Sequence, residues 1–150
     1  MSNKYRILLI DDDVSISETL QILLESYGYT VDIASTGKEA IEKTDKNFFN
    51  LAIVDWKLPD IDGTKLLGLL RETSPRMVKI MLTGFPSVQN AIDSINAHAD
   101  AFLQKPVDPE DLLRMIDDLI SKQQQAKNRE EQKIAEFISD RIQQISDKPT

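Results

Sequence analysis

Short apolar runs rich in β-branched residues alternate along this chain with longer segments of helical periodicity. The runs predict strands at 5–10, 30–34, 51–54, 78–82 and 100–103. The periodic segments predict helices at 14–27, 37–46, 64–72, 87–97 and from Pro109 onward. Because parallel strands are joined by right-handed crossovers, this alternation predicts an α/β fold in which helices cover both faces of a doubly wound parallel sheet.

Polar residues directly follow four of the predicted strands. In an open parallel sheet, ligands bind beyond the carboxyl ends of the strands, so these residues are the candidates for a functional site. We interpret the last aspartate after the first strand, Asp13, as the cap of the following helix. The set after strands one, three, four and five is Asp11, Asp12 and Asp13, then Asp55, then Thr83, then Lys105 and Pro106.

Three of these carboxylates, on Asp11, Asp12 and Asp55, predict a magnesium site. Two like charges about 4 Å apart repel by about 4 kcal/mol at an effective dielectric of 20, so the cluster requires a cation. Carboxylate oxygens without cysteine or histidine neighbours favour Mg²⁺ over softer metals. With Lys105 neutralising the remaining charge, Asp55 would be placed to accept a phosphoryl group as an acyl phosphate.

Four motifs occur in order, each at the end of a predicted strand: LLIDDD at 8–13, VDWKLPDIDG at 54–63, MLTG at 81–84 and FLQKP at 102–106. Together they resemble the response-regulator receiver family of two-component signalling, the CheY-like domains. The resemblance covers roughly residues 5–122. It implies a flavodoxin-like, five-stranded sheet in the order 2-1-3-4-5, with a receiver domain over 1–122.

The resemblance also implies roles for individual residues. Asp55 would be the phosphoacceptor, and Asp11, Asp12, Asp55 and the backbone carbonyl of Lys57 would hold Mg²⁺. Thr83 and Lys105 would each bind a phosphoryl oxygen.

The signalling change implied by the resemblance begins at Thr83. Phe102 matches the family's switch aromatic, which turns inward when the threonine moves toward the phosphate. Pro106 would follow a cis peptide bond. The face formed by helix 87–97, strand 100–103 and the helix from Pro109 would then change shape.

Several further side chains have simpler interpretations. We expect His98 to be an exposed helix terminator with positive φ, and Trp56 to pack or partly cover the surface. The resemblance implies that the positions of Lys57 and Phe85 tune how long the phosphoryl group survives.

The C-terminal residues 123–150 predict a helical extension of the last helix. Residues 122–133 are polar, with Ala126 their only apolar residue. An apolar stripe at helical spacing follows and ends before Pro149, and it must pack on its own domain, a second copy or a partner. The stripe consists of Ile134, Phe137, Ile138, Ile142 and Ile145.

These features predict a cytoplasmic phosphoacceptor regulator and not an enzyme. Its partners would be a histidine kinase or phosphotransfer protein and a downstream protein, with a homodimer also open. The net charge of −7 disfavours direct nucleic-acid binding. There is no cysteine for a disulfide or a thiolate zinc site, and no apolar stretch long enough to cross a membrane.

Three alternatives stay open. The first is the receiver fragment of a longer transcription regulator or signalling enzyme. The second is a Mg²⁺-dependent phosphohydrolase with an aspartyl nucleophile, for which Asp11 to Ser15 provide only part of the expected DxDx[TV] pattern. The third is a flavodoxin-like nucleotide binder, which three aspartates in the first loop disfavour because they would repel phosphate.

Overall fold

Five parallel strands form one sheet in the order β2-β1-β3-β4-β5 in the computed structural model, which describes residues 5–84 and 87–146. This order confirms the predicted doubly wound, flavodoxin-like fold. Each strand lies within one or two residues of its predicted bounds. The strands are β1 (Arg6–Ile10), β2 (Thr30–Ala34), β3 (Leu51–Asp55), β4 (Val78–Thr83) and β5 (Ala101–Gln104).

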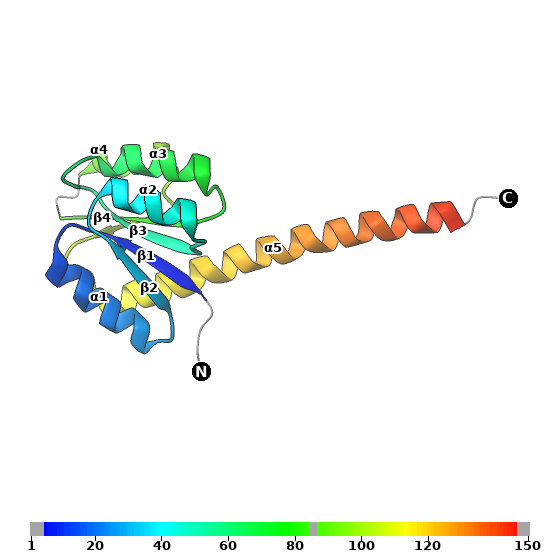
Figure 1. Ribbon diagram of the computed structural model, residues 1–150, viewed down its shortest axis with the longest axis horizontal. Coiled ribbons are helices and arrows are strands. Elements are labelled where there is room, and N and C mark those ends of the chain that lie inside the picture. The colour runs from blue at the N-terminus through cyan, green and yellow to red at the C-terminus, as the bar shows by residue number, and fades with distance from the viewer. Residues whose placement is uncertain (1–4, 85–86, 147–150) are drawn as a thin grey trace.

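Helices cover both faces of the sheet, as Figure 1 shows. Helices α1 and α5 lie on one face, and α2, α3 and α4 lie on the other. The helices are α1 (Val14–Ser26), α2 (Gly37–Lys46), α3 (Gly63–Thr73), α4 (Val88–Asn96) and α5 (Pro109–Ser146).

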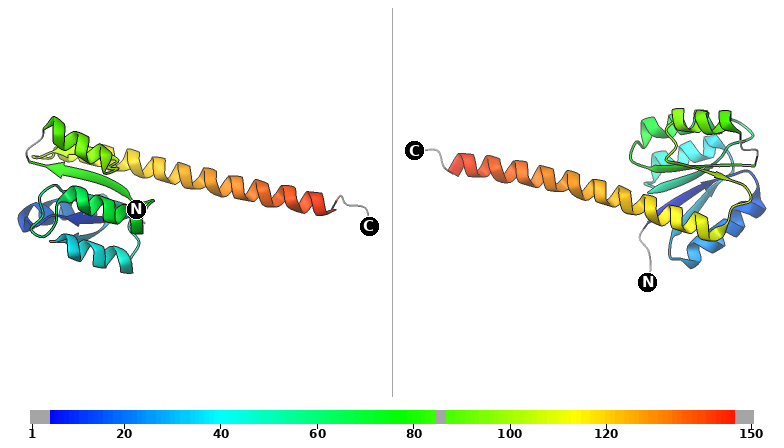
Figure 2. Two further views of the ribbon diagram at one scale, coloured as in Figure 1. Left: turned by 90° about the horizontal axis from the view of Figure 1, so that it is seen from above. Right: turned by 180° about the vertical axis from the view of Figure 1, so that it is seen from behind.

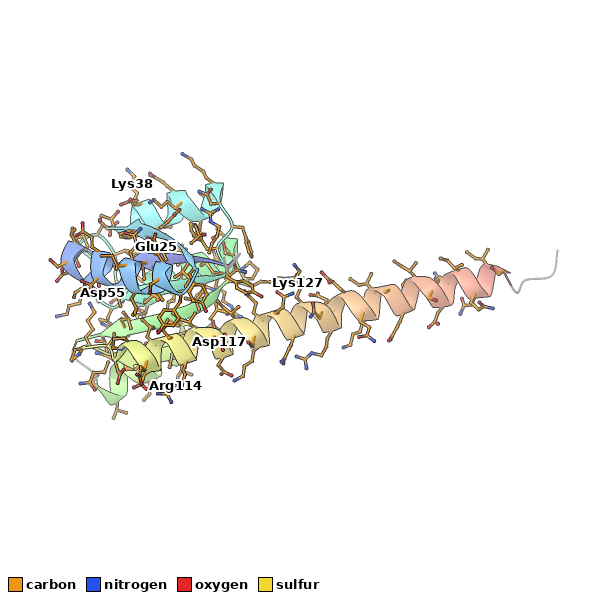
Figure 3. The ribbon with its side chains drawn as sticks, turned by 90° about the horizontal axis from the view of Figure 1, so that it is seen from below. Glu25, Lys38, Asp55, Arg114, Asp117 and Lys127 are labelled. Carbon is orange, nitrogen blue, oxygen red and sulfur yellow. The ribbon has the colours of Figure 1, made fainter. Side chains whose placement is uncertain are left out.

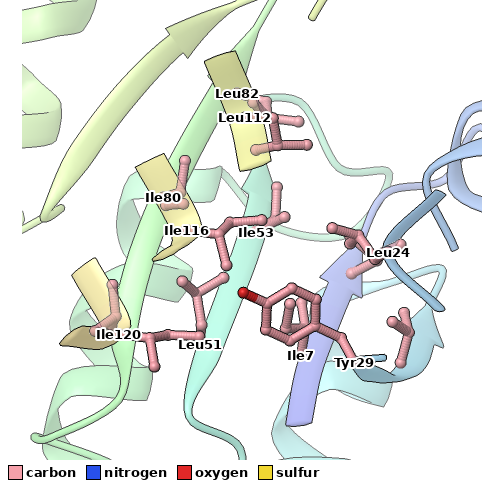
Figure 4. Packing of buried hydrophobic residues seen from close by; sticks show 13 residues of the cluster. Ile7, Leu24, Tyr29, Leu51, Ile53, Ile80, Leu82, Leu112, Ile116 and Ile120 are labelled. Carbon is pink, nitrogen blue, oxygen red and sulfur yellow. The ribbon is translucent and has the colours of Figure 1, made fainter. Parts of the chain in front are cut away.

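The three interior strands β1, β3 and β4 are buried on both faces, which explains their nearly continuous apolar sequences. Side chains alternate between the faces, so each face has its own hydrophobic cluster. Leu112, Ile116 and Ile120 of α5 pack on one face against β3 and β4 (Figure 4). Leu66, Leu67 and Leu70 of α3 belong to the second hydrophobic cluster, which lies on the opposite face of the sheet.

Helix ends follow the predicted local chemistry. The Asp13 side chain accepts a hydrogen bond from the Ile16 N–H, which confirms it as the cap of α1. Gly28 and His98 both have positive φ after a helix end, at 92° and 66°. The exposed His98 therefore terminates α4 as predicted.

Helix α5 is longer than the domain that it covers. Its first part packs on the sheet, and the rest projects away from the domain (Figures 1 and 2). It runs to Ser146, and Pro149, before which the apolar stripe was predicted to end, falls outside the described residues. Among the described helices, α5 included, none is long and apolar enough to cross a membrane.

Candidate functional site

The register of the sheet brings the ends of β1, β3 and β4 to one edge. Asp55, the last residue of β3, lies opposite Leu82 of β4, so Thr83 comes one step later. The Lys105 N–H donates to the Thr83 carbonyl at 2.7 Å, which places Lys105 beside the end of β4. Asp11 follows β1, the other neighbour of β3. The predicted site residues therefore converge although they are far apart in sequence.

The carboxylates of Asp11, Asp12 and Asp55 form the predicted cluster. Each provides an oxygen that lies within 4.8 Å of the others. Asp11 and Asp55 are 6% and 7% exposed, whereas Asp12 is exposed to solvent. Two of the three carboxylates are therefore largely removed from water. Their mutual repulsion is stronger in the protein interior than it would be in solvent.

The ammonium of Lys105 lies between the two buried carboxylates. Its Nζ is 3.1 Å from Asp11 Oδ2 and 3.2 Å from Asp55 Oδ1. The second oxygen of Asp11 accepts a hydrogen bond from the Asp13 N–H at 2.9 Å. Asp11 is therefore fixed from both sides, by the lysine and by the turn that leads into α1.

The pKa values of Asp55 and Lys105 reflect this arrangement. Burial, reinforced by the negative charge of Asp11, raises the pKa of Asp55 to about 6, although Lys105 opposes the shift. Burial also opposes the charge on Lys105, but Asp11 and Asp55 outweigh it and raise the pKa of the ammonium. Lys105 therefore does not fully offset the combined effect of burial and of the Asp11 charge on Asp55, so a further cation would be favoured.

The loop after β3 carries Trp56 and Lys57 past the cluster. Trp56 is half-buried and packs against the second hydrophobic cluster, as predicted. The backbone N–H of Trp56 donates to the Leu82 carbonyl at 2.8 Å, which continues the β3–β4 ladder beyond Asp55. Lys57 is exposed and forms an isolated antiparallel bridge with Asp62.

Two residues that support this loop were not identified as functional from the sequence. A Cβ atom on Gly63 would lie 2.7 Å from the Asp55 carbonyl oxygen and 2.9 Å from that of Trp56, so only glycine fits there. Asp60 accepts hydrogen bonds from the N–H groups of Gly37 and Lys38, which lower the pKa of its carboxyl. Both residues belong to the 54–63 motif, but their roles depend on contacts that the motif does not reveal.

The remaining predicted residues lie around the same edge. Thr83 is 2% exposed at the end of β4. Phe102 of β5 is half-buried against the second hydrophobic cluster, and the bond between Lys105 and Pro106 is cis. Phe85, whose position was predicted to tune how long the phosphoryl group survives, falls outside the described residues.

A cavity of about 370 Å³ opens over these side chains. Its chemistry fits Mg²⁺, because its donors are hard carboxylate oxygens with no histidine or cysteine in the lining. The lining residues are Asp11, Asp12, Asp13, Ile16, Asp55, Trp56, Lys57, Thr83, Gly84 and Lys105. A larger cavity of about 660 Å³ lies beside α5 and contains none of these residues.

Comparison with protein families gives a match over most of the chain. The model of the response regulator receiver domain matches residues 7–117. Among relatives, the transcriptional regulatory protein ZraR of Escherichia coli (strain K12) is 32% identical over 106 residues, which cover 71% of this chain and 24% of ZraR. The transcriptional regulatory protein TrcR of Mycobacterium tuberculosis (strain ATCC 25618 / H37Rv) is 31% identical over 115 residues, covering 77% of this chain and 45% of TrcR.

Solved structures share both fold and sequence with this chain. A CheY-like response regulator receiver domain protein from Methanospirillum hungatei JF-1 is 44% identical with a TM-score of 0.80, and the match covers 83% of this chain and 99% of that one. The beryllofluoride-activated NtrC4 receiver domain dimer is 36% identical with a TM-score of 0.75, covering 79% and 98%. The chain thus spans nearly all of these isolated domains but only part of the regulators ZraR and TrcR.

Proposed function

The chain belongs to the response regulator receiver domain family of two-component signalling, and on that premise we propose that it accepts a phosphoryl group on Asp55 with Mg²⁺ bound beside it. The observation that carries this proposal is the position of Lys105 Nζ, which lies between the buried carboxylates of Asp11 and Asp55 at the end of the central strands. Three carboxylates and one ammonium leave a net negative charge, which one more cation can neutralise. With that cation bound, the cluster can accept an incoming phosphate.

Asp11, Asp12, Asp55 and the backbone carbonyl of Lys57 would hold the metal ion. When bound, Mg²⁺ neutralises charge on the acids and on the phosphoryl oxygens. Asp11 already has one oxygen fixed by the Asp13 N–H and the other by Lys105. The protein therefore holds this ligand in place before any ion arrives.

A carboxylate oxygen of Asp55 attacks the phosphorus of the donor. The new O–P bond forms an acyl phosphate, and the bond from phosphorus to the leaving group of the donor breaks. Lys105 is placed to pair with one phosphoryl oxygen, and the Thr83 hydroxyl to bond another. The natural donor would be the phosphohistidine of a histidine kinase or of a phosphotransfer protein.

The signal would leave the domain through α4, β5 and α5. As Thr83 moves toward the phosphoryl group, Phe102 would turn inward from its half-buried position on β5. Next to β5, α4 exposes an apolar stripe of Val88, Ile92 and Ile95, which are 78%, 43% and 69% exposed. We propose that a downstream protein contacts this surface.

A second candidate is that the chain is the receiver portion of a longer transcription regulator or signalling enzyme. The observation that favours it is the partial coverage of ZraR and TrcR, of which the match spans 24% and 45%. In either case we propose that the domain acts in the cytoplasm, through protein contacts and without binding nucleic acid itself. The encoded length of the natural gene distinguishes the two candidates.

The test is phosphorylation by a small donor. The protein is incubated with Mg²⁺ and acetyl phosphate, and intact-mass spectrometry measures the addition of a single phosphoryl group. We expect the group on the wild type, and none after chelation of Mg²⁺ or in Asp55→Asn.

Asp32→Asn is the matched control. Asp32 is a half-buried carboxylate on the edge strand β2 that pairs with Arg6 of β1, away from the cluster of Asp11, Asp12 and Asp55. This variant should be labelled like the wild type. Labelling that persists in Asp55→Asn would refute the assignment of Asp55. Continuous release of phosphate from phosphate esters would instead support a phosphohydrolase.

A further inference from the structure

The apolar stripe of α5 is exposed along its whole length. Ile134, Phe137, Ile138, Ile142 and Ile145 are 55%, 63%, 51%, 59% and 70% exposed. Figures 1 and 2 show that no other element of the described chain runs beside this part of the helix. Scattered apolar residues on a surface are ordinary, but five on one stripe indicate a contact surface.

A helix in this position lacks the support that helices normally have. Isolated helices shorter than about 12–15 residues are marginal in water, and most helical stability in proteins comes from packing of an apolar face. Beyond Glu130, which pairs with Arg76 of the domain, the helix continues to Ser146. Packing of the stripe on another surface would supply the missing stabilisation.

The charges around the stripe favour a protein surface over an anionic one. Residues 129–146 contain three basic side chains, Arg129, Lys133 and Arg141, and four acidic ones. The acidic residues are Glu130, Glu131, Glu136 and Asp140. This balance gives no electrostatic attraction to a lipid surface or to nucleic acid, and it is compatible with a second copy of the same helix.

The stripe lies on the same side of α5 as the residues that pack on the sheet. Ile134 follows Ile116 by 18 residues, and Ile138 follows Ile120 by the same interval, which is five turns at about 3.6 residues a turn. Ile116 and Ile120 are buried against the sheet. The face of the helix that the domain covers near its start is therefore the face left uncovered near its end.

This shared face determines how two copies could pair. A partner helix running parallel and in register would, when followed back toward its start, occupy the space of the receiver domain itself. An antiparallel partner would instead place its own domain beyond the far end of the helix. We propose that α5 forms an antiparallel dimer with a second copy of this chain through the stripe.

The spacing of the stripe fits this pairing. With the two-fold axis between Ser139 and Asp140, Ile134 lies opposite Ile145 of the partner subunit, and Phe137 lies opposite Ile142 of the partner subunit. Ser146 then lies opposite Lys133 of the partner subunit, short of Glu130 where α5 meets the domain. The pairing therefore uses only the projecting part of the helix, whose side chains Figure 3 shows beyond Lys127.

The size of the contact predicts a reversible dimer. The paired segment of 133–146 is about 20 Å long at 1.5 Å a residue, which places the interface at or below the low end of specific contacts, roughly 1,200 Å² in total. Dissociation at micromolar concentrations is therefore expected. The pairing needs no phosphoryl group, so it does not depend on the proposed function.

The first test is the mass in solution, measured by sedimentation or light scattering from about 1 µM to about 500 µM. We expect the mass to double across this range for the wild type and for Asp55→Asn. Ile142→Glu, which places a carboxylate opposite Phe137 of the partner subunit, should remain monomeric throughout. The matched control is Ile22→Glu, because Ile22 of α1 is 70% exposed but lies outside the stripe, and this variant should dimerise. Circular dichroism and Trp56 emission establish that each variant is folded.

The second test measures direction, and it is simple because the chain has no cysteine. An equimolar mixture of Ile134→Cys and Ile145→Cys should form the mixed disulfide on mild oxidation, identified by peptide mass. Either variant alone should crosslink poorly, since its two sulfurs would lie about 16 Å apart along the axis.

Several results would overturn the proposal. A wild-type protein that stays monomeric at every concentration would refute the dimer. Efficient homodisulfides from each single variant, without the mixed one, would establish a parallel pairing instead. Binding to anionic lipid vesicles that is lost in Ile142→Glu, without self-association, would assign the stripe to a membrane surface.

Discussion

The carboxyl edge of the sheet and the end of α5 depart from ordinary burial in opposite directions. At the edge of the sheet, Asp11 and Asp55 are buried although they carry charge. On the projecting helix, large apolar side chains such as Ile142 are exposed although burial would stabilise them. Buried charge and exposed apolar surface are the two observations that most strongly indicate function, because folding alone disfavours both.

The comparison also shows what each region lacks. The three acids are balanced by only one lysine, so a further cation would stabilise them. The stripe is uncharged, so an apolar partner would stabilise it. The two needs are chemically different, so binding at one region leaves the other unsatisfied. Each region can therefore be tested separately on the same protein.

The largest expected effect compares two isoleucines on one face of α5. Ile116 is 0% exposed in the core and Ile134 is 55% exposed on the stripe. Ile116→Ala should lower the free energy of unfolding by about 3 kcal/mol, because it leaves a cavity against β3 and β4. Ile134→Ala should lower it by less than about 0.5 kcal/mol. Urea unfolding followed by Trp56 emission measures both.

These measurements are made at low protein concentration, where the proposed dimer is dissociated. At high concentration, Ile134→Ala should in addition weaken the dimer. A large loss for Ile134→Ala at low concentration would mean that the stripe packs on its own domain, and the contrast between the two ends of α5 would be lost.

The next effect concerns the backbone beneath Asp55 and uses two glycines of α3. Gly63→Ala should destabilise the fold by about 2 kcal/mol, because the new Cβ meets the carbonyl oxygens of Asp55 and Trp56. It should also slow phosphorylation by acetyl phosphate, since the backbone at Asp55 must move. Gly68→Ala is the control, because nothing lies within 4 Å of its Cβ, and it should stabilise by about 0.5–1 kcal/mol. Equal effects of the two substitutions would refute the close approach at Gly63.

A smaller effect tests whether Mg²⁺ binds the three acids. At a Mg²⁺ concentration ten times the dissociation constant, the metal should stabilise the fold by about 1.4 kcal/mol. Asp12→Asn should abolish much of this gain. Asp13→Asn should retain it, because asparagine caps α1 about as well as aspartate does. Thermal unfolding with Mg²⁺ or chelator measures the difference, and no stabilisation of the wild type at millimolar metal would contradict a magnesium site.

The sequence predicted the fold and the convergence of the site, for identifiable reasons. Strand period, helix period and caps such as Asp13 are local signals, and parallel connectivity brings strand ends together whatever the details. Asp11, Asp55 and Lys105 were therefore predicted to meet because each follows a strand.

What the sequence did not reveal depends on contacts between distant residues. Gly63 is one of five glycines in the chain, and only its distance to the Asp55 backbone distinguishes it. The stripe at Ile134 was predicted, but periodicity cannot tell what covers an apolar face. Its shared side with Ile116 becomes informative only once the domain is known to occupy that side.

The smallest expected effect on the free energy of unfolding is at the point where α5 leaves the domain. There Arg76 pairs with Glu130 at 3.1 Å. Both side chains are more than half exposed, so the pair contributes roughly 0–1 kcal/mol at most. Arg76→Ala should therefore change the unfolding free energy by less than about 0.5 kcal/mol. Gln123→Ala should have the larger effect, about 1 kcal/mol, because its amide donates to the carbonyls of Asn50 and Arg76. If Arg76→Ala instead lowers the unfolding free energy more than Gln123→Ala does, the domain holds α5 more firmly at Glu130 than at Gln123. The projecting part of α5 would then begin later than these contacts indicate.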